Sequence, residues 1–405
     1  MKYLKYRLLT VSFLVGLMLC SGITFAQPKK GFPMNLKKFP LTDFYNTSST
    51  FAKNGKPGDL IRSEKFDGYV VPPGVTATRI LYGTKTSKGD VAVSSGVVLI
   101  PPGEAPKGGW PVIAWAHGTS GANRKCAISL TAMGFAMYRI PNAHLKNGYA
   151  VVATDYAGLG SDSAVAYMDR IGNAWDVIYS VKAAQKAVPS LGRRWLAIGH
   201  SAGAHTMGGV AELQADINDP SYLGIVSLSG LGNARDPMVF ISKDNPVLAF
   251  FICVSVKARY PAFEYTDVLT DKGLELFEQV KSKCQGPGFG PPGPSPIKGS
   301  EALKKDWDLN PYIDKYFKMD ESGQERYKGP ALVLIGEMET PHTMKNDPAV
   351  AKRMCQQEVD VLLKIISGAN HVSLLGLAIE DQTKWIADRF AGKEYPCNCE
   401  TILKK

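Results

Sequence analysis

The sequence predicts an α/β fold in which helices cover both faces of a mostly parallel central sheet. Short apolar, β-branched segments alternate with helical stretches along the chain, which is the pattern of this fold class. The short segments are apolar at consecutive positions, as expected for strands that are covered on both faces. An antiparallel pair is expected first, at 78–84 and 91–100. The buried strands are then expected at 112–116, 149–154, 195–199, 224–229, 331–335 and 360–366.

Helices are expected between these strands, and one long segment interrupts the alternation. The helical stretches are 172–187, 202–215, 348–357 and 379–390. Residues 233–329 are rich in aromatic side chains and include a Pro/Gly tract, so they are interpreted as an inserted cap or lid. The core is then split into 27–232, with an N-terminal extension to about residue 76, and 330–405.

Composition and charge exclude several classes of protein. With 405 residues, 45% hydrophobic and 21% charged, the chain has enough apolar side chains to fold, which excludes disorder. The formal net charge is +10, but the basic residues occur in scattered pairs rather than in one stripe. The sequence therefore lacks the continuous basic patch that is typical of nucleic-acid-binding proteins.

The N-terminus has the pattern of a signal peptide over residues 1–26. Basic residues precede an apolar run at 8–19, and Thr24 and Ala26 provide the small residues of a cleavage site. The run is too short for a lasting membrane span, so we expect a secreted or periplasmic mature chain without a transmembrane segment. Lipidation at Cys20 is disfavoured because Met18 and Leu19 are too bulky before such a cysteine.

Removal of the leader leaves six of the seven cysteines, an even number that suits disulfides in an exported protein. Cys253 lies in an apolar run and is equally compatible with a buried thiol. Cys397 and Cys399 are not followed by a second ligand pair, so a disulfide is favoured over zinc. The spacing of the cysteines alone does not determine which of them form disulfides with each other. The remaining cysteines are Cys126, Cys284 and Cys355.

The segment Gly199-His200-Ser201-Ala202-Gly203 predicts a nucleophilic serine. It is a G-x-S-x-G turn placed where an apolar strand ends and a small-residue helix begins. The turn presents the serine hydroxyl at the carboxyl end of the strand, and the flanking glycines allow the crowded backbone. We therefore expect Ser201 to be the nucleophile, with Gly199, His200 and Gly203 forming the elbow around it.

A serine hydroxyl needs an imidazole to accept its proton, and the chain has six histidines. His371 follows the expected strand 360–366, in a loop that would end at the same sheet edge as the elbow. It is the expected general base, and His342 is the reserve candidate.

The carboxylate that orients the imidazole should follow a strand between the serine and the histidine. The strand 331–335 leads into Gly336-Glu337-Met338-Glu339. The usual Gly-x-x-Asp turn selects Glu339, while Glu337 and Asp347 stay open as candidates.

Two backbone amides are expected to bind the oxyanion that forms during attack on a carbonyl. One is the amide of Ala202, directly after the nucleophile. The other is assigned to Thr119, in the glycine-bearing loop 116–121 that follows an early strand. This loop is also compatible with an ordinary Gly-rich turn.

Together these segments resemble the secretory lipase family of α/β-hydrolases from about residue 44 to 390. The matching pieces are the elbow, Cys126, and the segments 57–62, 80–82, 114–119, 155–160 and 368–371. The resemblance implies a serine esterase or lipase with a cap over an acyl pocket, and a disulfide from Cys126 to a cap cysteine such as Cys284. Glu339 departs from the aspartate that is commoner in the acid position.

The expected activity is hydrolysis of lipid-like or other apolar carboxylic esters through an acyl-enzyme, as part of lipid breakdown. No metal or organic cofactor is required for this chemistry. The expected partners are a small-molecule ester and, transiently, a lipid interface. Competing hypotheses are an esterase acting on acetyl or feruloyl groups of plant walls, a serine peptidase with the same triad, and a non-enzymatic adhesion module.

Overall fold

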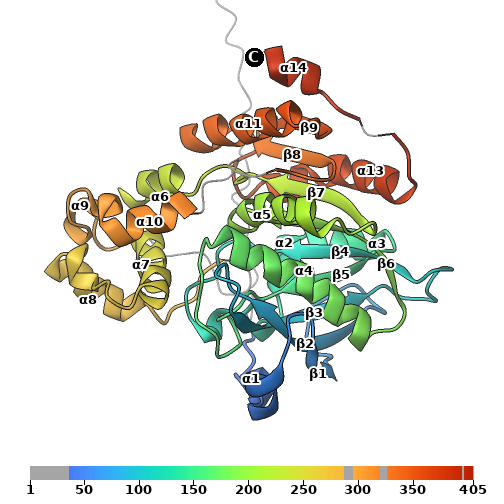
Figure 1. The fold of residues 1–405 in the computed structure, drawn as a ribbon, viewed down its shortest axis with the longest axis horizontal. Coiled ribbons are helices and arrows are strands. Elements are labelled where there is room, and N and C mark those ends of the chain that lie inside the picture. The colour runs from blue at the N-terminus through green and yellow to red at the C-terminus, as the bar shows by residue number, and fades with distance from the viewer. Residues whose placement is uncertain (1–35, 287–294, 320–325, 395, 405) are drawn as a thin grey trace, which may run out of the picture. The chain divides into compact units, whose positions relative to one another are not determined.

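A nine-stranded sheet with the order β1-β2-β3-β5-β4-β6-β7-β8-β9 forms the centre of the molecule (Figure 1). The structure is a computed structural model that describes residues 36–286, 295–319, 326–394 and 396–404. The predicted signal peptide, residues 1–26, lies outside the described residues. The strands are β1 (Leu60–Lys65), β2 (Thr76–Lys85), β3 (Val91–Ile100), β4 (Trp110–Ala116), β5 (Ala150–Thr154), β6 (Leu191–His200), β7 (Tyr222–Leu228), β8 (Ala331–Gly336) and β9 (Val361–Ile366).

The pairing of the strands confirms the predicted mostly parallel sheet. β2 and β3 are antiparallel, and every pair from β5 through β4 and β6 to β9 is parallel. The predicted strands all form, with ends that differ by a few residues. β1 was not predicted, because its residues Arg62, Glu64 and Lys65 are charged and the strand is only partly buried. It pairs antiparallel with β2 at the edge of the sheet.

Helices cover both faces of the sheet, and the side chains of β4 show how. Val112 and Ala114 are buried in the core beneath α4 (Arg170–Ala187), α5 (Ala202–Ile217) and α11 (Pro341–Gln356). Ile113 and Trp115 point to the opposite core, beneath α2 (Gly134–Tyr138), α3 (Ile140–Lys146) and α13 (Ile379–Phe390). Alternate residues of one strand therefore fill two separate cores, which explains the continuous apolar character of the strand.

The helix predicted from residue 348 begins seven residues earlier, at Pro341 of α11. The side chain of Thr340 caps it by accepting a hydrogen bond from the Thr343 amide at 3.2 Å, and Pro341 occupies the first turn, where no amide is needed. Pro348 therefore lies inside the helix. Burial of Val350 and Met354 against the sheet stabilises the helix despite the hydrogen bond that this proline removes.

The chain between β7 and β8 forms a helical insert at the left of Figure 1. Its helices are α6 (Arg235–Ser242), α7 (Val247–Arg259), α8 (Asp271–Val280), α9 (Gly299–Ala302) and α10 (Pro311–Met319). Phe250, Phe251 and Phe317 are buried in a third apolar core within the insert. Two of its segments, 287–294 and 320–325, lie outside the described residues.

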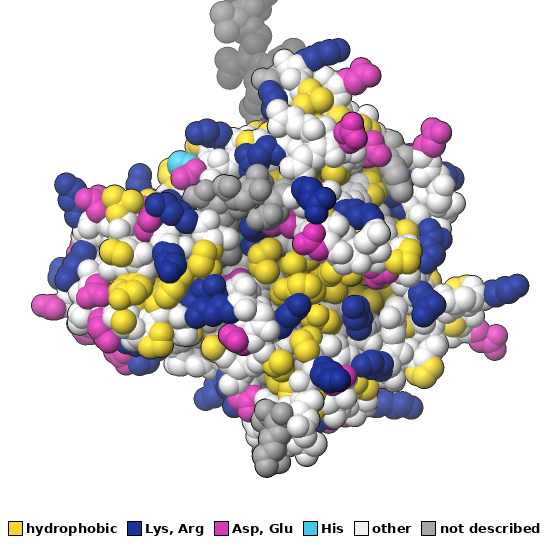
Figure 2. Space-filling model, viewed as in Figure 1, with side chains coloured by type: hydrophobic (Ala, Val, Ile, Leu, Met, Phe, Trp, Pro, Cys, Tyr) yellow, Lys and Arg dark blue, Asp and Glu magenta, His cyan; other side chains and the backbone are white. Residues whose placement is uncertain are grey.

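The remaining helices are short. They are α1 (Ser49–Asn54), α12 (Leu374–Leu377), α14 (Cys399–Lys404) and the 3₁₀ turns at 43–45, 124–126, 128–130, 265–267 and 307–309. Across the described ranges, no helix combines the length and the apolar character that crossing a membrane requires. On the face drawn in Figure 2, the Lys and Arg side chains are spread among acidic ones and form no continuous stripe.

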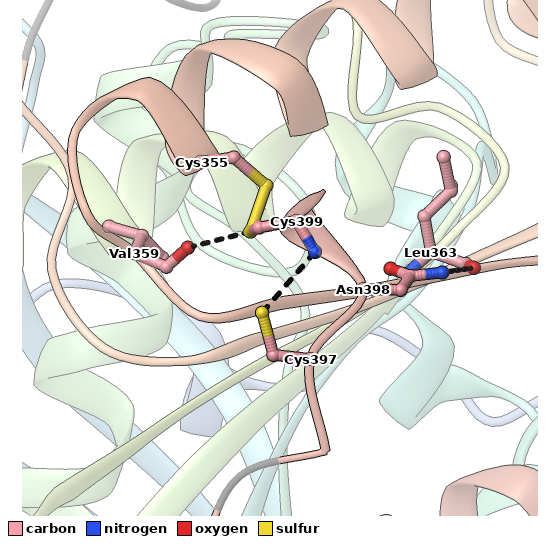
Figure 3. Close-up of a disulfide and its surroundings, with 6 residues drawn as sticks. All are labelled: Cys355, Val359, Leu363, Cys397, Asn398 and Cys399. Atoms are coloured by element: carbon pink, nitrogen blue, oxygen red, sulfur yellow. Dashed lines mark hydrogen bonds between the residues drawn. A yellow bond between two sulfur atoms is a disulfide. The ribbon is translucent and has the colours of Figure 1, made fainter. Parts of the chain in front are cut away.

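The C-terminal segment is fastened to the outer edge of the sheet. The Asn398 amide donates to the Val361 carbonyl at 2.9 Å, and its side chain exchanges two hydrogen bonds with the backbone of Leu363 at 2.9 and 2.8 Å. A disulfide joins Cys355 of α11 to Cys399 of α14 (Figure 3). These contacts cover the otherwise open edge of β9.

Candidate active site

Ser201 stands on a sharp turn between the end of β6 and the start of α5. Its backbone has φ 58° and ψ −119°, a strained conformation for a residue with a side chain. A Cβ added to Gly199 would lie 2.0 Å from the Gly203 carbonyl oxygen, and one added to Gly203 would lie 2.0 Å from the Ala116 carbonyl oxygen. Both glycines are therefore required for the turn to form.

His371 and Glu339 form a hydrogen-bonded pair at the carboxyl edge of the sheet. His371 Nδ1 lies 2.7 Å from Glu339 Oε1. Glu339 follows β8 and its side chain is only 2% exposed, whereas His371 follows β9 and is 44% exposed. Burial opposes the charge of the Glu339 carboxylate, but hydrogen bonds and the charge of His371 together lower its pKa. An ionised carboxylate fixes the proton on Nδ1 and leaves Nε2 free to accept another.

Glu337, the second candidate for the acid, lies on the surface and performs a different role. It accepts hydrogen bonds from the Gly368 amide at 2.8 Å and the Ser367 hydroxyl at 2.9 Å. These hydrogen bonds lower the pKa of Glu337. The residue thereby anchors the start of the loop that carries His371.

Asp347, the third candidate acid, and His342, the reserve base, have partners outside this pair. The carboxylate of Asp347 is buried and accepts the amides of Gly230 and Gly232, at 2.8 and 2.9 Å, in the loop after β7. Burial raises the pKa of Asp347 to about 6. The ring of His342 packs against Phe240, with 5.1 Å between the ring centroids.

The loop that carries Thr119 lies against the elbow. A Cβ on Gly118 would be 3.2 Å from the Cβ of Ser201. The Tyr138 hydroxyl donates to the Gly118 carbonyl at 3.1 Å, and the Tyr156 hydroxyl donates to the His117 carbonyl at 2.8 Å. Because a trans peptide places its C=O and N–H on opposite sides, the bond from Tyr138 also fixes the direction of the following amide, that of Thr119.

These tyrosines were missed by sequence reasoning. Tyr138 lies in no motif, and Tyr156 lies in the segment 155–160 that resembles the family, but an aromatic side chain in a buried segment gives no sign of the carbonyl that its hydroxyl reaches. A third, Tyr167, shares a 2.8 Å hydrogen bond with the Thr119 hydroxyl.

A cavity of about 570 Å³ is lined by Ser201, His371, Glu339, Thr119 and Ala202 together. The residues singled out from four separate parts of the sequence therefore meet at one place. Much of the remaining wall is apolar and comes partly from the insert: Met137, Met168, Pro237, Met238, Ile241, Leu248 and Leu375.

The insert is also fastened directly to the loop that carries Thr119. A disulfide joins Cys126 to Cys284, the pair that the family resemblance implied. Next to it, the Gln285 amide donates to the Ser120 carbonyl at 2.9 Å. A Cβ on Gly286 would lie 2.6 Å from the Thr119 carbonyl oxygen. The disulfide therefore holds the insert against the proposed oxyanion loop.

We expect the double variant Cys126→Ser/Cys284→Ser to lose about 10- to 100-fold in kcat on a p-nitrophenyl ester, because the insert is no longer held covalently beside the loop of Thr119, whose amide is the expected oxyanion donor. The matched control is Cys355→Ser/Cys399→Ser, which removes the distant disulfide at the edge of β9. The control should lower the thermal midpoint and leave kcat close to wild type. Equal losses of kcat in both variants would contradict a specific effect on the loop.

The strand order, the helices on both faces and the strand–turn–helix elbow define the class of the protein as an α/β-hydrolase. The family model of secretory lipases matches residues 124–397, more than half of the chain. The chain belongs to the secretory lipase family, and it is thus an ester hydrolase of the lipase and esterase type. This membership and the two disulfides fit an exported protein.

Solved structures show the same fold at low sequence identity. Candida antarctica lipase A in its closed state is 15% identical, with a TM-score of 0.72, over 88% of this chain and 87% of that chain. A rice cell wall degrading esterase, LipA from Xanthomonas oryzae, is 17% identical, with a TM-score of 0.63, over 83% of this chain and 98% of that chain. The search of curated proteins finds no match to the chain.

Proposed function

We propose that the protein hydrolyses carboxylic esters of apolar acyl groups, with Ser201 as nucleophile, His371 as general base and Glu339 as the acid that orients it. The observation that carries this proposal is the 2.7 Å bond from His371 Nδ1 to Glu339 Oε1, in the wall of the cavity that Ser201 also lines. The export signal at 1–26 and the role of 233–329 as a cap are part of the same proposal.

The reaction follows from the chemistry of these groups. Ser201 Oγ attacks the ester carbonyl while Nε2 of His371 accepts its proton, and Glu339 stabilises the imidazolium that forms. The amides of Thr119 and Ala202 donate to the oxyanion of the tetrahedral intermediate. The alcohol leaves with the proton from His371. A water molecule activated by the same imidazole then attacks the acyl-enzyme, and the carboxylic acid is released.

Labelling with a fluorophosphonate probe tests the nucleophile and its activation together. We expect the probe to attach to Ser201 in the folded protein, as located by mass spectrometry of the digested product. Heat-denatured protein is the control and should stay unlabelled, because an isolated serine is a poor nucleophile. Absence of label in the folded protein, or label on another serine, would overturn the proposal.

The apolar wall of the cavity supports an apolar acyl chain as substrate. In a series of p-nitrophenyl esters from acetate upward, kcat/KM should rise about three- to fourfold per added methylene until the cavity is filled. Met238→Gln, which places an amide in the wall, should flatten this rise. Activity that is highest on the acetate ester and falls with acyl length would instead favour an esterase for acetyl groups of plant walls, and no dependence on acyl length would count against an apolar pocket.

A further inference from the structure

His200, the residue directly before Ser201, contacts the backbone of the proposed base. It is only 5% exposed, and its Nε2 lies 2.9 Å from the carbonyl oxygen of His371. The two imidazole rings lie 4.8 Å apart between centroids, at an angle of 45°. The residue before the nucleophile therefore bridges β6 and the loop after β9, two elements that must be aligned for proton transfer.

The position of the proton on His200 follows from its surroundings. A carbonyl oxygen only accepts, so Nε2 must carry the hydrogen, and in the neutral ring Nδ1 is then unprotonated. Nδ1 has no hydrogen-bond partner among the described residues, and it faces Gly118, whose added Cβ would lie 3.3 Å away. A proton on Nδ1 would therefore be buried without an acceptor.

Burial and the neighbouring His371 also favour the neutral form of His200. Burial is the main cause that lowers the pKa of His200 to about 3, and the neighbouring charge of His371 adds to it. The backbone bond to His371 and the more distant carboxylate of Glu339 act in the opposite direction and are outweighed. The third ring nearby, that of Tyr138, carries no charge at neutral pH because burial raises its pKa further.

The contact from His200 adds a second anchor to the loop that carries His371, whose start is held by Glu337. The His371 side chain is 44% exposed, so packing alone does not hold it. The hydrogen bond from Nδ1 to Glu339 lets the ring pivot about that bond. The hydrogen bond from His200 restrains the backbone of the same residue and thereby limits where Nε2 of His371 can point.

We infer that His200 is a positioning residue that holds His371 in register with Ser201 through one Nε2–H···O=C hydrogen bond and stays neutral throughout catalysis. This inference rests on the proposed function, because it assigns His200 a role relative to Ser201 and His371. The role differs from proton transfer, since Nε2 of His200 is occupied by a carbonyl that cannot exchange a proton.

Two substitutions separate this role from a merely structural one. The side-chain amide of glutamine can reach the place of Nε2, whereas that of asparagine reaches only the place of Nδ1. We expect His200→Asn to lower kcat on p-nitrophenyl butyrate about 10- to 100-fold with little change in KM. We expect His200→Gln to stay within about fivefold of wild type. The rate of fluorophosphonate labelling should follow the same order.

The pH profile provides a second measurement. His200→Gln should keep the acid limb of the kcat/KM profile with the same number of ionisations as wild type, because His200 does not titrate in that range. Loss of an ionisation in this variant would show that His200 itself transfers a proton, which overturns the inference. Equal activity losses in the Gln and Asn variants, in proportion to their thermal destabilisation, would also overturn it.

If a variant does not fold, the inference can still be tested on the wild-type protein. In ¹⁵N NMR of the histidine rings, several buried histidines should stay neutral, and the ring of His200 should be among them, protonated at Nε2 and without titration between about pH 5 and pH 9. Assignment of such a signal to His200 would support the inference, and a titrating His200 would refute it. Fluorophosphonate labelling of wild-type Ser201 is read separately, so a failure of the proposed function is distinguished from a failure of this inference.

Discussion

Replacing either Ser201 or His371 by alanine is expected to lower kcat on p-nitrophenyl butyrate by about 10⁴- to 10⁶-fold. Without the hydroxyl no acyl-enzyme forms, and without the imidazole the hydroxyl keeps its proton. Because the two groups act in one step, the double variant should be no worse than either single variant. Steady-state kinetics with each purified variant measures all three values.

The control for this prediction is His342→Ala, at the histidine that sequence reasoning kept in reserve. Its ring packs against Phe240 on α6 and is not part of the wall of the cavity that Glu339 and His371 line. The activity of this variant should stay within about threefold of wild type. Unfolding curves must show that the alanine variants remain folded. If Ser201→Ala turned over substrate at a rate near that of the wild type, Ser201 would not be the nucleophile.

The parts of the fold that could be predicted are those in which a short sequence pattern is compatible with only one local structure. The strand β4 is apolar at every position because it fills two cores, so it could be recognised without any knowledge of its neighbours. The G-x-S-x-G turn could also be recognised from the sequence alone. Side chains at Gly199 or Gly203 would collide with backbone atoms 2.0 Å away, so only glycine serves there.

Glu339 was harder to choose because Glu337 and Asp347 stand close to it in the chain. All three are carboxylates after the same strand, and the Gly-x-x-Asp spacing favoured Glu339 but left the other two open as the partner of His371. In the structure the three carboxylates have different partners. Glu337 lies on the surface and accepts from one amide and one hydroxyl of the His371 loop. Asp347 is buried and accepts two amides of the loop after β7, whereas Glu339 contacts the imidazole. The direction of each side chain depends on the tertiary fold.

The hydrogen bonds that support the site could not be predicted for a similar reason. Tyr138, Tyr156 and His200 each donate to a backbone carbonyl that lies 20, 39 and 171 residues away in the sequence, respectively. Carbonyls are common to all residues, so the sequence carries no sign of which one will be bound. Such partners emerge only when the elements are packed.

Replacing Glu339 by glutamine is expected to lower kcat by about 10³- to 10⁴-fold with little change in KM. The amide keeps the size of the side chain but has no negative charge to stabilise the imidazolium. Its NH₂ group can also face Nδ1 of His371 and favour the tautomer with the proton on Nε2. That tautomer cannot accept the proton of Ser201.

Glu337→Gln is the matched control, because it makes the same chemical change two residues away. Glutamine at 337 can still accept from the loop amide, so kcat should stay within about threefold of wild type. Glu339→Asp should lose less activity than Glu339→Gln, because the charge is kept and only the reach is shortened. If instead the Glu337 variant loses activity and the Glu339 variant does not, the hydrogen bond between Glu339 and His371 serves only the stability of the loop, and the catalytic acid lies elsewhere on this edge of the sheet.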